Sequence, residues 1–461
     1  MSVMAAFMVP HPPMIVPAIG RGREAQIQET IRAYEQVAEE IAELRPETIV
    51  ITSPHSVMYA DYFHISPGKR AKGSFSDFGA SQVKFAEEYD EELVNQICLE
   101  AGKKRFPAGT MGEKSARLDH GTMVPLWFIR QKYQEGKIVR IGLSGLPLTE
   151  HYEFGQMIRD AVDALGRKVV FVASGDLSHK LQEYGPYGFA PEGPEYDCRI
   201  MDVCSRGAFG ALFDFDEVFC ERAAECGHRS FVIMAGAFDG VNVQAKELSH
   251  QDVTGVGYGI CTFYPQGADE GRHFLKEHLD VLKEKLSKRK AGADPYVKLA
   301  RRSLETYIRE GSRIRVPEGL PEEMLKMRAG AFVSIHKHGK LRGCIGTIEP
   351  VTGSVAEEII RNAVSAATQD PRFDPITEDE LKWLEINVDV LGKPEKISSI
   401  DQLDVKRYGV IVSRGYRRGL LLPDLEGVDT PKQQVSIALQ KGGIREDENY
   451  QMERFEVIRH T

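Results

Sequence analysis

The chain has 461 residues, of which 42% are hydrophobic and 28% are charged, and its formal net charge is −9 at pH 7. This length is typical of two or three domains, and the acidic balance argues against a nucleic-acid-binding protein. Since no apolar stretch approaches the roughly 18 residues of a membrane span, and the first residues lack a basic leader, we expect neither a membrane segment nor a secretory signal.

The first half of the chain alternates short apolar runs with amphipathic stretches. Residues 4–10 and 47–54 end in proline and predict buried strands, and residues 24–44 between them have apolar side chains at helical spacing. Further segments follow in order: 137–147 as a strand, 150–165 as a helix, 168–179 as a strand, 231–240 as a helix or strand, and 253–265 as a closing strand. This order predicts an α/β fold with a mostly parallel sheet flanked by helices.

The character of the sequence changes after residue 268. A charged amphipathic helix is predicted there, and a Gly-Ala-Asp-Pro break follows it. We therefore predict a first domain over residues 1–268, a helical linker over 269–290 and a smaller α+β domain over 291–461. The predicted elements of the second domain are helices at 296–311 and 351–368, strands at 330–346 and 384–392, and a hairpin at 409–424.

Cysteine usage bears on the compartment. The seven cysteines are scattered, odd in number and contain no C-x-x-C pair. This pattern argues against a disulfide framework and against a zinc ribbon, and it favours a cytoplasmic location.

Four histidines stand at the ends of predicted strands or in adjoining loops: His11 in "VPHPP", His55 in "SPHS", His120 in "LDHGT" and His179 in "SGDLSH". Loops at the carboxyl ends of parallel strands converge on the ligand crevice, so these residues can meet although they are distant in sequence. Imidazole binds iron, zinc and copper, and it transfers protons near neutral pH. Each histidine alone could equally cap a turn or pair with a carboxylate, but the four together favour a common site.

These motifs, in this order and spacing, resemble those of the class III extradiol ring-cleavage dioxygenases of the LigB type and of their Memo-like relatives, over about residues 1–265. The resemblance implies that His11 and His55 bind a metal together with a later glutamate, in a 2-His-1-carboxylate arrangement suited to Fe(II). It also implies that His120 and His179 act as acid and base on the substrate.

Two neighbouring residues are candidates for the third metal ligand. In "ERAAECGHRSF" we favour Glu225 slightly over Cys226. "CGHRSF", and Asp176 in "SGDLSH", resemble the Memo-like branch more closely, in which a cysteine occupies this part of the site. Fe(II) is the expected metal, and a cysteine ligand would instead favour Zn or Cu, or a differently tuned iron.

Residues 290–461 resemble an AMMECR-type domain. The motifs that carry this resemblance are "KLRGCIG" (340–346), "AATQDPRFDP" (366–375) and "RGLLLPD" (418–424). Arg342 offers a planar fork for a carboxylate or phosphate. Cys344 could be a nucleophile, although we favour a small buried side chain beside a tight turn.

The fusion resembles components of the AmmeMemoRadiSam system, whose name implies a separate radical SAM protein as a partner. We expect an Fe(II)-dependent enzyme of the extradiol type that acts on a catechol-like or related small molecule, with the AMMECR-type domain helping to bind a substrate or partner. The alternatives are a Memo-like metal-binding protein without ring cleavage and a zinc-dependent hydrolase. Neither nucleic acid nor membrane is an expected partner, and a homo-oligomer is left open.

Overall fold

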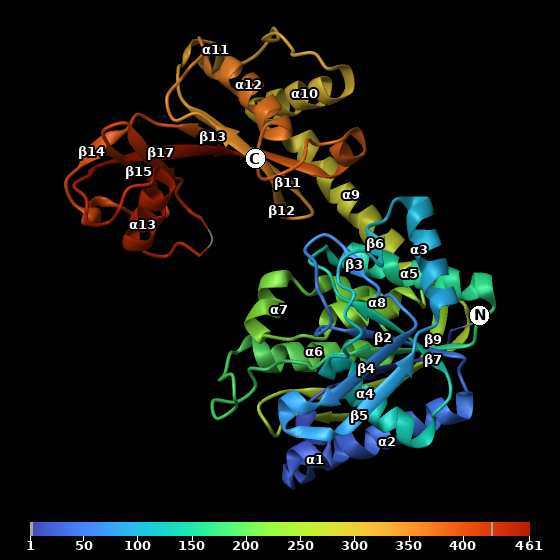
Figure 1. Cartoon of the computed structure of the whole chain (residues 1–461). Coiled ribbons are helices and arrows are strands. Elements are labelled where there is room, and N and C mark those ends of the chain that lie inside the picture. The colour runs from blue at the N-terminus through green and yellow to red at the C-terminus, as the bar shows by residue number, and fades with distance from the viewer. Residues whose placement is uncertain (1–2, 426) are drawn as a thin grey trace. The chain divides into compact units, whose positions relative to one another are not determined.

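The computed structural model describes residues 3–425 and 427–461. These residues form two compact units, and the boundary lies between Leu279 and Asp280 (Figure 1). The boundary between the units falls inside one unbroken helix, α9 (Phe274–Gly292). Within the described residues, no helix is both long and apolar enough to cross a membrane.

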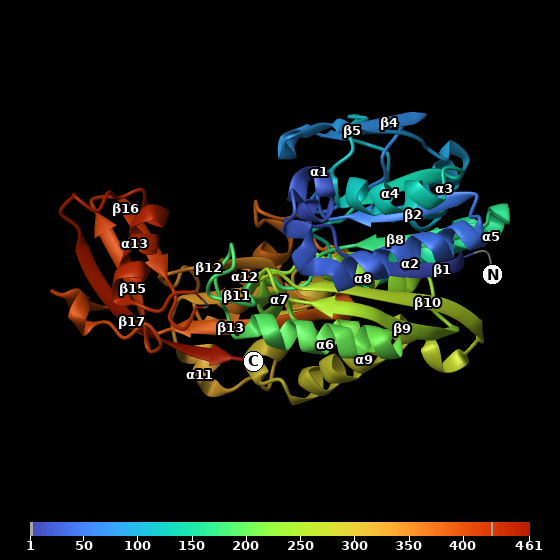
Figure 2. The same ribbon diagram turned by 90° about the horizontal axis from the view of Figure 1, so that it is seen from below.

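The first unit is built on a sheet with the strand order β7-β2-β8-β1-β10-β9. Strands β7, β2, β8 and β1 are parallel, whereas β10 and β9 complete the sheet antiparallel to their neighbours. Figure 2 shows β2, β8, β1, β10 and β9 following one another in this order. The predicted mostly parallel sheet is confirmed. The strands are β1 (Val3–Val9), β2 (Thr48–Ser53), β7 (Lys137–Gly142), β8 (Val169–Ser174), β9 (Val241–Gln251) and β10 (Tyr258–Ala268).

Helices cover both faces of this sheet, because its strands are apolar on both sides. In β1, Ala5, Phe7 and Val9 belong to one core cluster, whereas Ala6 and Met8 belong to the other. The first cluster is covered by α2 (Gln28–Leu44) and α4 (His120–Lys132), and the second by α3 (Glu91–Lys104), α5 (Leu148–Leu165), α6 (Glu192–Arg206) and α8 (His228–Gly236).

A second layer of chain lies outside the main sheet. Strands β4 (Arg70–Phe75) and β5 (Ala80–Glu88) form an antiparallel hairpin, and a short 3-10 helix, Ser76–Phe78, makes its turn. This turn brings the ring of Phe78 within 5.4 Å of the ring of His120, measured between centroids. The hairpin therefore contributes to the surroundings of the candidate site.

The second unit contains an antiparallel sheet with the order β12-β11-β13-β17-β15-β16, and β14 pairs with β17. The predicted α+β character of this part is confirmed. Its strands are β11 (Ala331–Lys337), β12 (Lys340–Gly346), β13 (Leu384–Leu391), β14 (Glu395–Ile397), β15 (Tyr408–Arg414), β16 (Arg417–Leu421) and β17 (Gln451–His460).

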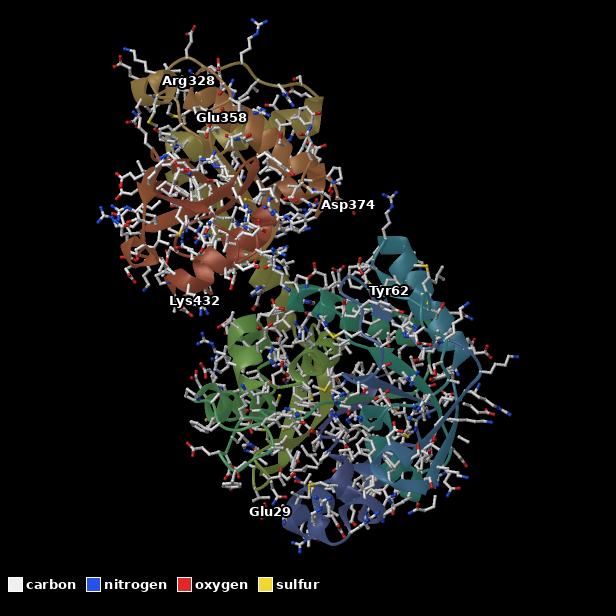
Figure 3. All side chains as sticks on the ribbon, turned by 60° about the vertical axis from the view of Figure 1, so that its left-hand side comes forward. Glu29, Tyr62, Arg328, Glu358, Asp374 and Lys432 are labelled. Carbon is white, nitrogen blue, oxygen red and sulfur yellow. The ribbon has the colours of Figure 1, made fainter. Side chains whose placement is uncertain are left out.

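Helices pack on two parts of this second sheet. Helices α10 (Pro295–Glu310) and α12 (Val355–Thr368) share a core with β11 and β13, and α13 (Pro431–Gly442) packs against β15 and β16. Charged side chains lie on the outside of both units, as Glu29 on α2 and Lys432 on α13 illustrate (Figure 3).

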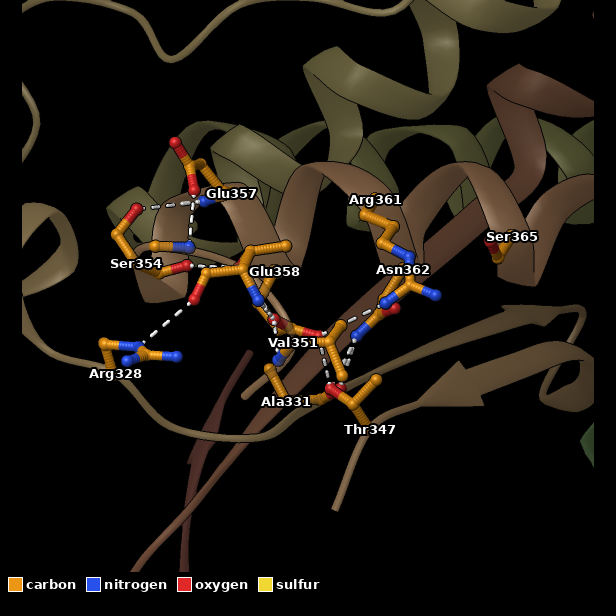
Figure 4. A network of polar contacts seen from close by, with 12 residues as sticks. Arg328, Ala331, Thr347, Val351, Ser354, Glu357, Glu358, Arg361, Asn362 and Ser365 are labelled. Carbon is orange, nitrogen blue, oxygen red and sulfur yellow. Dashed lines mark hydrogen bonds and ion pairs between the residues drawn. The ribbon is translucent and has the colours of Figure 1, made fainter. Parts of the chain in front are cut away.

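A buried carboxylate holds the turn that follows β12. Glu358, on α12, is fully buried and accepts hydrogen bonds from the hydroxyls of Thr347 (2.5 Å) and Thr352 (2.7 Å). It also accepts from the backbone N–H groups of Val351 (3.1 Å) and Thr352 (3.0 Å) (Figure 4). These charge-assisted bonds tie residues 347–352 to the helix.

Candidate metal centre

The site lies where parallel strands of the first unit end. His11 follows β1, His55 follows β2, and the segment from Gly175 to His179 follows β8. Because these strands are parallel and adjacent, or separated by one strand, their carboxyl ends meet at one edge of the sheet. At this edge the structure brings together His11 and His55, whose Nε2 atoms are 3.0 Å apart.

Two glycines bring a further segment to this edge. A Cβ on Gly175 would lie 2.1 Å from the Cα of Gly227, so that only glycine fits at this approach. The approach places Cys226, just before α8, against the loop after β8. Its backbone N–H lies 3.4 Å from the carbonyl oxygen of Asp176, and its Sγ lies 3.3 Å from the N–H of Asp176.

His11, His55 and Cys226 form a cluster of the size that a metal ion needs. Their ligand atoms lie within 4.8 Å of one another, and Sγ of Cys226 is 3.6 Å from Nε2 of His11. His11 is buried, whereas His55 is exposed and opens the cluster to solvent. Two imidazoles and a thiol are a donor set that suits Zn, Cu(I) or iron.

Hydrogen bonds orient the imidazole of His11. Its Nδ1 lies 2.9 Å from Oγ of Ser174, and this hydroxyl donates its own hydrogen to the carbonyl of Gly121 at 2.6 Å. Nδ1 must therefore carry a proton and donate to Ser174, which leaves the lone pair of Nε2 facing the cluster. The sequence did not single out Ser174, because its role depends on a contact between distant segments.

Burial and the neighbouring histidines disfavour protonation of His11 and His55. Burial, together with His55, His120 and His179, lowers the pKa of His11 well below its usual value. Desolvation and the ring of His120 lower the pKa of His55 to about 4, against the opposing effect of Asp119. Neutral imidazoles with free lone pairs are the form that binds a cation.

Asp119 positions both His55 and His120. It caps the N-terminus of α4 by accepting from the N–H of Thr122 (3.0 Å), so His120 is the first residue of that helix. Its carboxylate also accepts from Ser53 (2.5 Å), whose oxygen accepts in turn from the N–H of His55 (3.2 Å). As a result, the rings of His55 and His120 stack with 4.0 Å between centroids.

His120 and His179 lie beside the cluster, but their ring nitrogens are not among its potential ligand atoms. The ring of His120 is 5.5 Å from that of His11, and burial lowers its pKa. His179 packs edge-on against Tyr187 at 5.1 Å, and its buried Nδ1 has no hydrogen-bond partner among the described residues. Burial lowers the pKa of His179 as well.

The carboxyl groups of Glu225 and Asp176 accept hydrogen bonds from backbone N–H groups and are not part of the cluster. Glu225 accepts from the N–H of His228 (2.6 Å) at the start of α8, and Asp176 accepts from the N–H of His11 (2.6 Å). Burial raises the pKa of each carboxyl to about 7. The geometry thus brings Cys226, and not the favoured Glu225, to the two histidines. Burial and the nearby carboxyls raise the pKa of Cys226 well above its usual value, so a thiolate there requires a cation beside it.

A cavity of about 350 Å³ adjoins His55 and His120. It is bordered by Phe78 from the β4–β5 turn and by Arg117 and Arg140. Arg117 is exposed, whereas Arg140 is buried and donates to the carbonyl oxygen of Arg117 (2.5 Å). The cavity is large enough for a compound of one or two rings.

The two candidates of the second unit have internal partners. Arg342 forms a two-pronged ion pair with Glu380, at 3.0 Å for both bonds, and donates to the carbonyl of Asp374 at 2.8 Å. Sγ of Cys344 lies 3.3 Å from the hydroxyl of Ser334, and burial raises the pKa of this thiol. A raised pKa makes Cys344 a poor nucleophile at neutral pH.

Comparison with known proteins agrees with this architecture. Residues 5–261, more than half of the chain, match the catalytic LigB subunit of aromatic ring-opening dioxygenases. The chain belongs to the LigB family. Residues 297–460 match the AMMECR1 family, so the LigB-type domain is followed by an AMMECR1 domain.

Relatives of the LigB-type chain include complete and partial matches. A protein of Clostridium acetobutylicum is 42% identical over 468 residues, which cover 100% of this chain and 99% of the relative. A Thermotoga maritima protein is 53% identical over 171 residues, or 37% of this chain and 98% of the relative. An uncharacterized Pyrococcus horikoshii structure shares 31% identity, with a TM-score of 0.34, over 36% of this chain and 88% of its own. One from Escherichia coli K12 shares 15% identity, with a TM-score of 0.37, over 56% and 99%.

Proposed function

We propose that the LigB-type domain is a metal-dependent enzyme that acts on a small oxygenated molecule in the cavity beside His55 and His120. The observation that supports this most is the convergence of His11, His55 and Cys226, since His55 also lines that cavity. Two imidazoles and one thiol leave further coordination positions for a substrate. The expected Fe(II) fits this donor set, as do Zn and Cu(I).

The residues of the chain have distinct roles in this proposal. A bound metal ion supplies Lewis acidity and, if it is iron, a centre for oxygen chemistry. His120 and His179 hold and move protons at the substrate hydroxyl, because both are neutral imidazoles that border the cluster. Phe78 and Arg117, which line the cavity, contact the substrate in this proposal.

Metal content tests the ligand set. The purified protein and its variants are loaded with Fe(II), Zn or Cu and then measured by elemental analysis. We expect His11→Ala, His55→Ala and Cys226→Ser to lose stoichiometric metal while circular dichroism remains unchanged. Cys198→Ser is the matched control, because Cys198 is exposed and lies outside the cluster. Full metal content in all three cluster variants would refute the proposal.

A second candidate function is metal binding without ring cleavage, which the thiol at the cluster favours over a carboxylate. Oxygen uptake by the iron-loaded protein with catechol compounds separates the two. Uptake that disappears in Cys226→Ser supports the enzyme, and tight Zn or Cu binding without any uptake supports the second candidate.

We propose for the AMMECR1 domain that it helps to bind a substrate or a partner, including a separate radical SAM protein. Its strands β11 and β12 pair Ser334 with Cys344, and burial raises the pKa of this candidate nucleophile. Binding is therefore a better role for it than catalysis.

A further inference from the structure

The second unit contains a cavity of about 550 Å³. It lies between the C-terminal part of α9, helix α10 and the strands β11 and β13. Three cationic side chains border it, Arg289, Lys290 and Arg301, and His336 adds an imidazole.

Arg301 lines this cavity and is incompletely paired within the described residues. Its Nη2 donates to the carbonyl of Leu384 at 2.9 Å, whereas the buried Nε and Nη1 have no hydrogen-bond partner among the described residues. Nη1 lies 3.5 Å from Glu305, a loose ion pair on the same helix. Because Glu305 is a distant partner on the same helix, the positive charge of Arg301 is only weakly compensated within the described residues.

Lys290 is close to Arg301, and its positive charge is likewise only weakly compensated. Its Nζ contacts two backbone carbonyls, those of Leu381 at 3.4 Å and Lys382 at 3.5 Å. Burial and the charge of Arg301 lower its pKa. Among the described residues that line the cavity, Glu385 has the single acidic side chain, and it already pairs with Arg289.

We propose that this cavity binds an organic anion, whose carboxylate or phosphate group pairs with Arg301 and Lys290. Its apolar part packs against Leu286, Val297 and Ile386, which also line the cavity. The volume is within the range of small-molecule sites, roughly 300–1,000 Å³. This inference rests on the binding role proposed for the AMMECR1 domain and gives that role a site and a ligand class.

Calorimetric titration of the full chain with phenyl phosphate, benzoate and uncharged benzyl alcohol tests the inference. We expect one of the two anions to bind and benzyl alcohol to bind at least about 10-fold more weakly, since the alcohol lacks the charge that strengthens hydrogen bonds to Arg301 and Lys290. Which anion binds more tightly identifies the head group. Failure of both anions to bind, or equal binding of benzyl alcohol, would overturn the proposal.

Variants locate the binding site. Lys290→Gln and Arg301→Gln should each weaken the anion at least about 10-fold, and if Arg301→Gln does not fold, Lys290→Gln alone decides. Lys298→Gln is the control, because Lys298 lies on the same helix as Arg301 but is exposed and does not line the cavity. Cys226→Ser should bind the anion like the parent, so a failure of the metal site is distinguishable. Equal losses in Lys298→Gln and Lys290→Gln would show that the anion binds elsewhere.

Discussion

Ser174 fixes the tautomer of His11, since its hydroxyl donates to Gly121 and can only accept from Nδ1 of the imidazole. Ser174→Ala removes that acceptor, so the ring can rotate or carry its proton on Nε2. We expect metal affinity to fall about 10-fold, as it does when other groups that orient a ligand are lost. Competition with a chelator measures this change.

Ser249→Ala is the control for this experiment. Ser249 is also buried, but it lies on β9 and its hydroxyl has no partner among the described residues. Its loss should leave metal affinity as in the parent. If Ser174→Ala also bound metal like the parent, the hydroxyl would not orient the ligand.

His120 and His179 should serve chemistry rather than metal binding. We expect His120→Asn and His179→Asn to keep the metal and to lower turnover of a catechol-type substrate on the order of 100-fold, because a proton donor or acceptor is lost. Oxygen uptake and metal content are measured on the same samples. His64→Gln is the control, since His64 is a buried histidine outside the cluster. Loss of metal from His179→Asn would instead identify His179 as a ligand.

The pair of Arg342 and Glu380 should make the second unit sensitive to acid. Burial alone would raise the pKa of Glu380, but hydrogen bonds from Arg342, the N–H of Thr377 and Lys337 lower it to about 2. A carboxyl whose pKa is lowered by folding stabilises the fold above its unfolded pKa near 4.3, and this contribution disappears as the pH falls towards 2. It amounts to at most about 3 kcal/mol.

Glu380→Gln should therefore be less stable than the parent at pH 7, and the difference should shrink between pH 5 and pH 2. Urea unfolding followed by the fluorescence of Trp383, in a Trp127→Phe background, reports on this region, because Trp383 lies in the same 3-10 helix and Trp127 in the first unit. Glu378→Gln is the control, since the side chain of Glu378 is 72% exposed. A difference that stayed constant across this pH range would exclude the ion pair as its source.

Glu358 should be essential to the turn after β12. Glu358→Gln places an amide donor among groups that all donate to the carboxylate, so at least one of them loses its acceptor. We expect a loss of about 1–3 kcal/mol in the free energy of unfolding. Glu357→Gln, at an exposed position on the same helix, should cost less than about 0.5 kcal/mol. Equal losses in urea unfolding would contradict this account.

The sequence predicted the alternation of strands and helices in the first unit because its strands are short apolar runs that end in proline or polar loops. It did not predict β9 (Val241–Gln251) or the hairpin of β4 and β5, since these strands are largely exposed and their polar side chains do not mark a core. The same composition is typical of loops, and only pairing with neighbouring strands distinguishes them.

Prediction of the candidate site from the sequence was limited in a similar way. His11 and His55 could be placed together because each follows a strand of the same parallel sheet. The sequence favoured Glu225 slightly over Cys226, whereas the geometry places Cys226 at the histidines, because the outcome depends on the residue at which α8 begins and on the contact of Gly175 with Gly227. Ser174 is 163 residues from His11 and belongs to no motif, so only the folded chain reveals it.

The division of labour between Glu225 and Cys226 has a consequence for how such a centre can evolve. Glu225 secures the first turn of α8, and the next residue supplies the cluster's sulfur. Replacing the side chain at position 226 would therefore exchange a soft donor for a hard one without disturbing the helix that presents it. A substitution at this one position could therefore adapt the same fold to different metals and different reactions.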